Sequence, residues 1–192
     1  MKTSRLEAFS DGVVAILITI MVLELHKPEG SDWADIVQWL RDGPFLAYVL
    51  SFVFLGIYWN NHHHMLHLTS QVTGGILWAN LHLLFWLSLV PVATYWMGQN
   101  PHEKAPTAVY GIALLSAGIA YYILQQTIIK AQGHGSPLRA AVGKDLKGRI
   151  SPVIYAIAIG VAFVAPWLAW LLYLLVALMW LVPDRRIERY RA

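Results

Sequence analysis

The chain has 192 residues, of which 57% are apolar and 13% are charged, and its formal net charge is +3. Soluble domains carry about 25% charged residues, so this composition indicates a protein whose solvent is lipid. The sequence contains no cysteine, which excludes disulfide frameworks, thiol nucleophiles and cysteine-based metal sites. The basic residues lie in short segments between apolar runs, which argues against a nucleic-acid-binding patch and favours a role in membrane topology.

The first apolar run, Phe9 to Leu25, is interpreted as a retained transmembrane helix, because a spanning helix needs about 20 mostly apolar residues. Glu7 and Asp11 interrupt the basic region that a signal peptide would have, and no small-residue cleavage site follows. Asp11 lies about 140° around the helix axis from Ile16, so we expect it to face another helix. With 3.6 residues per turn, one uncharged face carries Gly12, Ile16, Thr19, Ile20 and Leu23.

Five more apolar runs follow, at residues 44–61, 76–97, 108–129, 151–165 and 167–182. Between the first two runs, Asp32 to Leu40 is expected to form a short interfacial helix, and Pro91 is expected to kink the third span. One helix over 151–182 would rise about 48 Å, too long for a hydrocarbon core of about 30 Å, so a hairpin at Ala165–Pro166 is favoured. The sequence therefore predicts a single all-α membrane domain, residues 1–192, with six transmembrane helices per subunit.

The distribution of Lys and Arg predicts the orientation. With six spans, one side of the membrane receives eleven of these residues and the other side receives three: Lys27, Arg41 and Lys104. Basic residues accumulate on the cytoplasmic side, so both termini are expected in the cytoplasm. The eleven are Lys2, Arg5, Lys130, Arg139, Lys144, Lys147, Arg149, Arg185, Arg186, Arg189 and Arg191.

Arg5, Phe9, Ser10 and Asp11 form the pattern R-x-x-x-F-S-D at the start of the first span. Ionisable groups at a membrane boundary are costly unless they are paired or hydrated. Arg5 and Asp11 do not share a helix face, so each is expected to take a partner from the second or third segment. The candidate partners are His63, His64 and His67 from the second segment and Trp78 and Asn80 from the third.

The longer pattern R-x-x-x-F-S-D-G-V-x-A-I-x-x-T resembles the first transmembrane helix of the bacterial relatives of transmembrane protein 175, the endosomal and lysosomal potassium channel. The likeness extends to the exit Glu24-Leu25-His26-Lys27-Pro28-Glu29, to the expected helix count and to the chain length. The resemblance implies a homotetramer in a bacterial plasma membrane, in which the first helices line the ion path.

Carried over by position, the resemblance also assigns roles to residues of the first helix. It implies that Arg5, Phe9, Ser10 and Asp11 make contacts that anchor the pore helix. Ile16 corresponds to a hydrophobic constriction, Thr19 to a threonine implicated in ion preference, and Ile20 and Leu23 to further apolar positions along the pore. A ring of Ile16 side chains can gate by dewetting, and the chain lacks the T-V-G-Y-G of a carbonyl-lined filter.

The resulting expectation is a potassium-preferring cation channel with no enzymatic activity, no metal and no cofactor besides the permeant potassium ion. Three alternatives stay open. The uncharged face of the first helix can instead pack against neighbouring helices. Asp11 can serve as the carrier site of a proton-coupled transporter. The His62–His67 cluster can hold a catalytic metal, although no carboxylate lies nearby in the sequence and no second His-x-x-x-His occurs.

Overall fold

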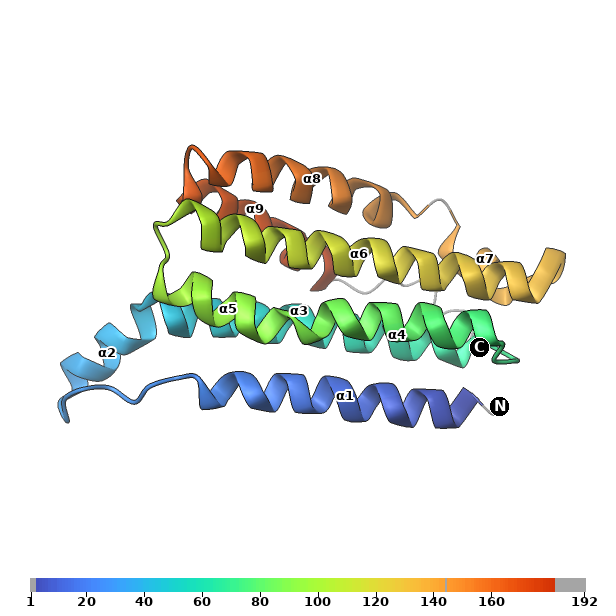
Figure 1. Ribbon diagram of the computed structural model, residues 1–192, viewed down its shortest axis with the longest axis horizontal. Coiled ribbons are helices and arrows are strands. Elements are labelled where there is room, and N and C mark those ends of the chain that lie inside the picture. The colour runs from blue at the N-terminus through green and yellow to red at the C-terminus, as the bar shows by residue number, and fades with distance from the viewer. Residues whose placement is uncertain (1–2, 144, 182–192) are drawn as a thin grey trace.

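The computed structural model describes residues 3–143 and 145–181, and over those residues the chain is helical with short connections (Figure 1). Four segments are long and apolar enough to cross a membrane: Thr3–Leu23, Gly43–His67, Gly74–Gln99 and Lys104–Gly135. The apolar helix Pro166–Leu181 is shorter. In chain order the helices are α1 (Thr3–Leu23), α2 (Trp33–Arg41), α3 (Gly43–His67), α4 (Gly74–Ser88), α5 (Val90–Gln99), α6 (Lys104–Gln132), the 3-10 helix η1 (Gly133–Gly135), α7 (Pro137–Val142), α8 (Leu146–Ala162) and α9 (Pro166–Leu181).

The helix bounds differ from the expected ones mainly at the charged ends. α1 begins at Thr3 and ends at Leu23, whereas the sequence predicted Phe9 to Leu25. The helix that contains the second apolar run extends beyond the expected end of the span near Asn61, because α3 continues through the histidines to His67. Apolarity locates only the part of a helix that lies in lipid, and histidine is compatible with a helix that continues into water. α6 and α8 likewise begin earlier in the chain than the apolar runs inside them.

The third apolar segment is interrupted in the middle. α4 ends at Ser88 and α5 begins at Val90, with Leu89 between them and Pro91 in the first turn of α5. Proline has no backbone N–H and its ring clashes with the carbonyl four residues earlier, so the helix breaks just before it. The expected kink is therefore present, and it divides the segment into two helices.

α1 lies at one edge of the bundle (Figure 1). It packs against α3, α4 and α5, while α6, α8 and α9 form the opposite side. The start of α1, the α3–α4 connection and the α6–α8 connection lie at one end of the molecule, and α2 and the α8–α9 turn lie at the other (Figure 1). One face of α1 is consequently left without a partner within the described chain.

Buried hydroxyl groups link α3, α5 and α6 in the middle of the bundle. Thr94 Oγ1 lies 2.6 Å from Ser51 Oγ, which lies 2.8 Å from Tyr110 Oη. All three side chains are buried, so these hydrogen bonds satisfy polar groups that have no access to water. Next to them, Gly111 lets the Tyr173 hydroxyl of α9 approach the backbone of α6 so closely that a Cβ atom at this position would collide with it.

The last two helices form a hairpin. Phe163 to Ala165 reverse the chain, and α9 then packs along α8. α9 begins at Pro166. The first residue of a helix has no intrahelical acceptor for its N–H, so proline costs no hydrogen bond at this position. The end of the sixth expected span at Val182 and the basic segment after it lie outside the described residues.

Candidate functional site

α1 has one buried face and one exposed face. The buried residues are Leu6, Ser10, Val14, Leu17 and Met21, which recur at helical spacing and face the rest of the bundle. The opposite face carries large apolar side chains that are well exposed: Phe9 by 53%, Ile16 by 58%, Ile20 by 43% and Leu23 by 79%. Among the described residues, none covers the uncharged face predicted from the sequence.

Thr19 is the one hydroxyl-bearing residue of this exposed face in the described part of α1. Its Oγ1 donates to its own helix, at 2.9 Å from the carbonyl oxygen of Ala15 and 3.0 Å from that of Ile16. Because the proton is directed back at the backbone, the lone pairs of the oxygen remain free to accept from water or to contact a cation. Thr19 can thus present an oxygen ligand from an otherwise apolar surface.

A buried chain of side-chain hydrogen bonds attaches the other face of α1 to α3 and α4. Asn80 Nδ2 donates to Ser10 Oγ at 3.0 Å, and Asn80 Oδ1 lies 2.7 Å from His62 Nε2. Ser10 in turn donates to the carbonyl oxygen of Leu6 at 2.9 Å. Ser10, Asn80 and His62 are all buried, so each depends on these partners.

Asp11 takes its partner from α3. The indole Nε1–H of Trp59 donates to Asp11 Oδ1 at 3.0 Å, so this carboxylate faces another helix as expected. Arg5 is exposed and, within residues 3–143 and 145–181, forms no hydrogen bond or ion pair, so the expectation of a partner from a neighbouring segment is not met inside one chain. Arg5 lies in the first turns of α1, where water can hydrate its charge. Trp78, which was expected to be a partner of Arg5 or Asp11, is 75% exposed and forms no hydrogen bond with either residue.

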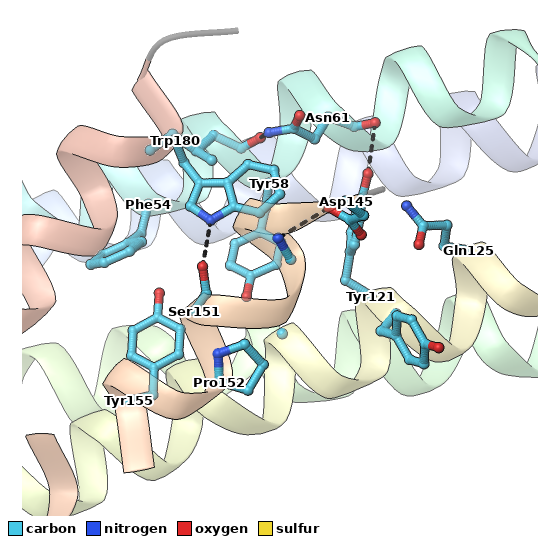
Figure 2. A pocket seen from close by; sticks show the side chains of 14 residues that line it. Phe54, Tyr58, Asn61, Tyr121, Gln125, Asp145, Ser151, Pro152, Tyr155 and Trp180 are labelled. Carbon is cyan, nitrogen blue, oxygen red and sulfur yellow. Dashed lines mark hydrogen bonds between the residues drawn. The ribbon is translucent and has the colours of Figure 1, made fainter. Parts of the chain in front are cut away.

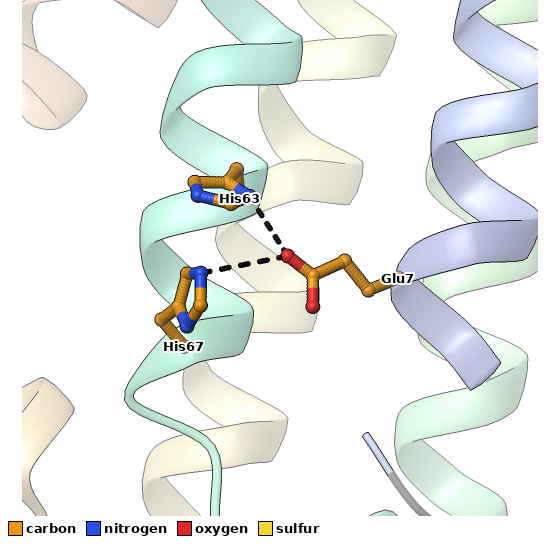
Figure 3. A group of neighbouring side chains, drawn as sticks. All are labelled: Glu7, His63 and His67. Atoms are coloured by element: carbon orange, nitrogen blue, oxygen red, sulfur yellow. Dashed lines mark ion pairs between the residues drawn. The ribbon is translucent and has the colours of Figure 1, made fainter. Parts of the chain in front are cut away.

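Two of the histidines meet a different carboxylate. His63 Nδ1 lies 2.8 Å from Glu7 Oε1, and His67 Nε2 lies 3.7 Å from the same oxygen (Figure 3). The expectation that His63 and His67 pair with Arg5 or Asp11 is therefore wrong: they face Glu7, one turn before Asp11. His64 contacts the ring of His63, edge to face, at 5.7 Å between centroids.

A separate cavity lies between α3, α6, α8 and α9, away from α1 (Figure 2). Its volume is about 60 Å³, which is room for a few water molecules. Trp180 Nε1 donates to Ser151 Oγ at 2.8 Å across it. The labelled lining residues are Phe54, Tyr58, Asn61, Tyr121, Gln125, Asp145, Ser151, Pro152, Tyr155 and Trp180. The exposed face and the anchoring contacts of α1 are therefore the stronger candidate site.

Asn80 was predicted from the sequence as a partner of the first helix. The individual contacts of Trp59 and His62, and the role of Glu7 as the partner of the histidines, were not predicted. Glu7 and Asp11 are one helical turn apart, so a search for residues sharing the face of Asp11 would have found Glu7. Trp59 and His62 carried no comparable signal, because their roles depend on how α3 is rotated against α1.

Comparison with known proteins identifies the family of this chain. The profile of the family described as the endosomal/lysosomal potassium channel TMEM175 matches residues 5–91. A protein from Chryseobacterium sp. named as a potassium channel is 53% identical over 189 residues, covering 98% of this chain and 97% of the relative. The chain belongs to the TMEM175 family.

Other family members match less closely. A crystal structure described as a lysosomal potassium-selective channel TMEM175 homologue from Chamaesiphon minutus superimposes with a TM-score of 0.79 at 26% identity, covering 95% of this chain and 97% of that one. The mouse relative, named an endosomal/lysosomal proton channel, is 32% identical over 119 residues, which is 54% of this chain and 23% of the mouse protein. TMEM175 family membership thus rests on the nearly full-length bacterial relative.

Proposed function

We propose that copies of this chain assemble into a potassium-preferring cation channel whose pore is lined by the exposed face of α1. The observation that carries the proposal is the division of α1 into one face bonded to α3 and α4 and one face that the described chain leaves uncovered. The proposal is supported by nearly full-length similarity to a bacterial protein named as a potassium channel and to a solved structure described as potassium-selective.

In this proposal the residues of α1 have distinct roles. Ile16, with Ile20 and Leu23 beyond it, forms a hydrophobic constriction that excludes water when narrow. Thr19 contributes the oxygen ligands that favour potassium. Ser10 and Asp11, bonded to Asn80 and Trp59, hold α1 in register. Arg5 and Phe9 extend the exposed face toward the start of the helix, where a neighbouring subunit supplies their contacts.

The proposed assembly is supported by the uncovered face of a single helix. One helix cannot enclose a path, so several copies must surround a common axis, and we propose four, as the resemblance implies. We further propose six spans, with the α8–α9 hairpin as the last two. α8 has 17 residues and would rise about 25 Å, which a locally thinned bilayer accommodates.

The positive-inside bias supports cytoplasmic termini in a bacterial plasma membrane. Lys2, Lys144 and the arginines after Val182, which contribute to that bias, lie outside the described residues. Potassium is the permeating ion, and the proposal needs no cofactor, no metal and no catalytic step.

The direct test is a reversal-potential measurement on purified chain reconstituted in lipid bilayers, with potassium on one side and sodium on the other. We expect unitary currents whose reversal potential lies far from zero, with the sign set by a potassium permeability well above that of sodium. In Thr19→Val the preference should fall toward equal permeability, because the replacement keeps the shape and removes the oxygen. Slow flux without unitary currents, tightly coupled to a proton gradient, would refute the channel and favour the transporter alternative at Asp11.

Proton conduction is a second candidate function, and the name of the vertebrate relatives favours it. The same bilayer recording separates the two. A proton current shifts the reversal potential with the pH difference across the membrane at constant potassium, whereas a potassium current does not.

A further inference from the structure

Glu7, His63 and His67 bring one carboxylate and two imidazoles together where α1 begins and α3 ends (Figure 3). His63 and His67 are one helical turn apart, so both imidazoles leave the same face of α3. One ligand atom from each of the three side chains lies within 4.8 Å of the other two. Two imidazole nitrogens and a carboxylate oxygen are a donor set that zinc takes in sites with three protein ligands.

The spacing of the donor atoms fits a tetrahedral ion. Zinc bonds of about 2.1 Å at tetrahedral angles place two ligand atoms about 3.4 Å apart. Glu7 Oε1 lies 2.8 Å from His63 Nδ1 and 3.7 Å from His67 Nε2, so the two observed separations lie on either side of that value. The ligand atoms of His63 and His67 lie within 4.8 Å of each other, so rotation of the side chains has to bring the three atoms to coordination distances.

The surroundings of the cluster allow an ion to enter and hold one ring in place. The exposed fractions of the side chains are 20% for Glu7, 32% for His63 and 45% for His67, so water can reach the site and supply a fourth ligand. The rings of His63 and His67 are nearly perpendicular, at 83°. The ring of His63 also stacks on that of Trp59 at 6.1 Å between centroids, which orients it.

We propose that Glu7, His63 and His67 bind a zinc ion that ties the first turns of α1 to the last turns of α3. The ion replaces a weak, half-exposed contact between the helices with coordination bonds. It would lie one turn from the bond between Asp11 and Trp59, so it reinforces the same junction. That the restrained helix lines a pore rests on the proposed function. Zinc binding and the link between α1 and α3 do not depend on it.

The test uses the purified full chain in detergent. Zinc is titrated in competition with a chelating dye, and we expect one zinc per chain. Loss of a single supporting group near a metal typically weakens binding 10- to 100-fold, so removing two ligands in His63→Gln/His67→Gln should weaken it at least ~100-fold. His134→Gln is the matched control, because His134 is an exposed histidine at the same end of the bundle and outside the cluster.

Hydrogen exchange provides the second readout. Zinc should slow exchange in residues 3–11 of the wild type and of His134→Gln, but not of the double variant. Glu7→Gln serves as an independent variant if the double variant does not fold. Wild-type zinc affinity in both ligand variants, or unchanged exchange of α1 with zinc bound, would overturn the proposal. Neither readout uses ion flux, so a failure of the channel proposal is detected separately, in the bilayer recording.

Discussion

The buried contacts of Asn80 predict how firmly α1 is held. Asn80→Leu keeps a side chain of similar size and removes two interhelical hydrogen bonds, one to Ser10 and one to His62. Such bonds contribute about 0.6–1.7 kcal/mol each in membrane proteins, so the substitution should lower the free energy of unfolding by about 1–3 kcal/mol. Asn100→Leu is the control, because the Asn100 amide follows the end of α5 and donates back to the Trp96 carbonyl of that helix, so it links no two helices.

A double-mutant cycle makes the prediction sharper. Ser10→Ala removes only one of the two bonds, and its cost should largely disappear in the Asn80→Leu background, because that bond is already lost. The assay is reversible unfolding of the purified protein in mixed detergent micelles, followed by circular dichroism. If Ser10→Ala costs the same in both backgrounds, the two side chains are not coupled, and the buried chain does not attach α1 to α4.

Three other substitutions test separate parts of the structure. Ile16→Asn should hydrate the constriction and raise resting potassium flux into proteoliposomes severalfold, and unchanged flux would count against Ile16 as the gate. Asp11→Ala removes the acceptor of the Trp59 indole N–H and should impair assembly or gating. Assembly is measured by native mass spectrometry, and gating by the open probability of single channels. A normally gated tetramer with altered ion preference would contradict this prediction. Gly111→Ala should lower the thermal midpoint by several degrees because its methyl collides with the Tyr173 hydroxyl, whereas Gly118→Ala, which meets only an ordinary contact, should not.

Much of the fold was predictable because the membrane imposes strong rules on sequence. Apolar run length located the four segments that are long and apolar enough to cross a membrane, and Pro91 predicted the interruption of the third. Helical periodicity also located the uncharged stripe that includes Ile16, but it left open whether that stripe packs against other helices or stays uncovered.

The interhelical partners were less predictable, because they depend on the rotation and depth of one helix relative to another. The run of histidines looked like a polar connection, yet His62 is buried against Asn80 while His63 and His67 face Glu7. Adjacent positions on a helix point in directions about 100° apart, so neighbours of one residue type can have unrelated environments. A single sequence contains no measure of that rotation.

The interruption at Leu89 divides the polar contacts of the third segment between two helices. α4 carries Asn80, which is bonded to α1, and α5 carries Thr94, which is bonded to α3. α1 packs against both α4 and α5, so it contacts the segment on either side of the interruption. One proline thus places the side-chain bond to the first helix and the side-chain bond to the second on separate helices of one segment.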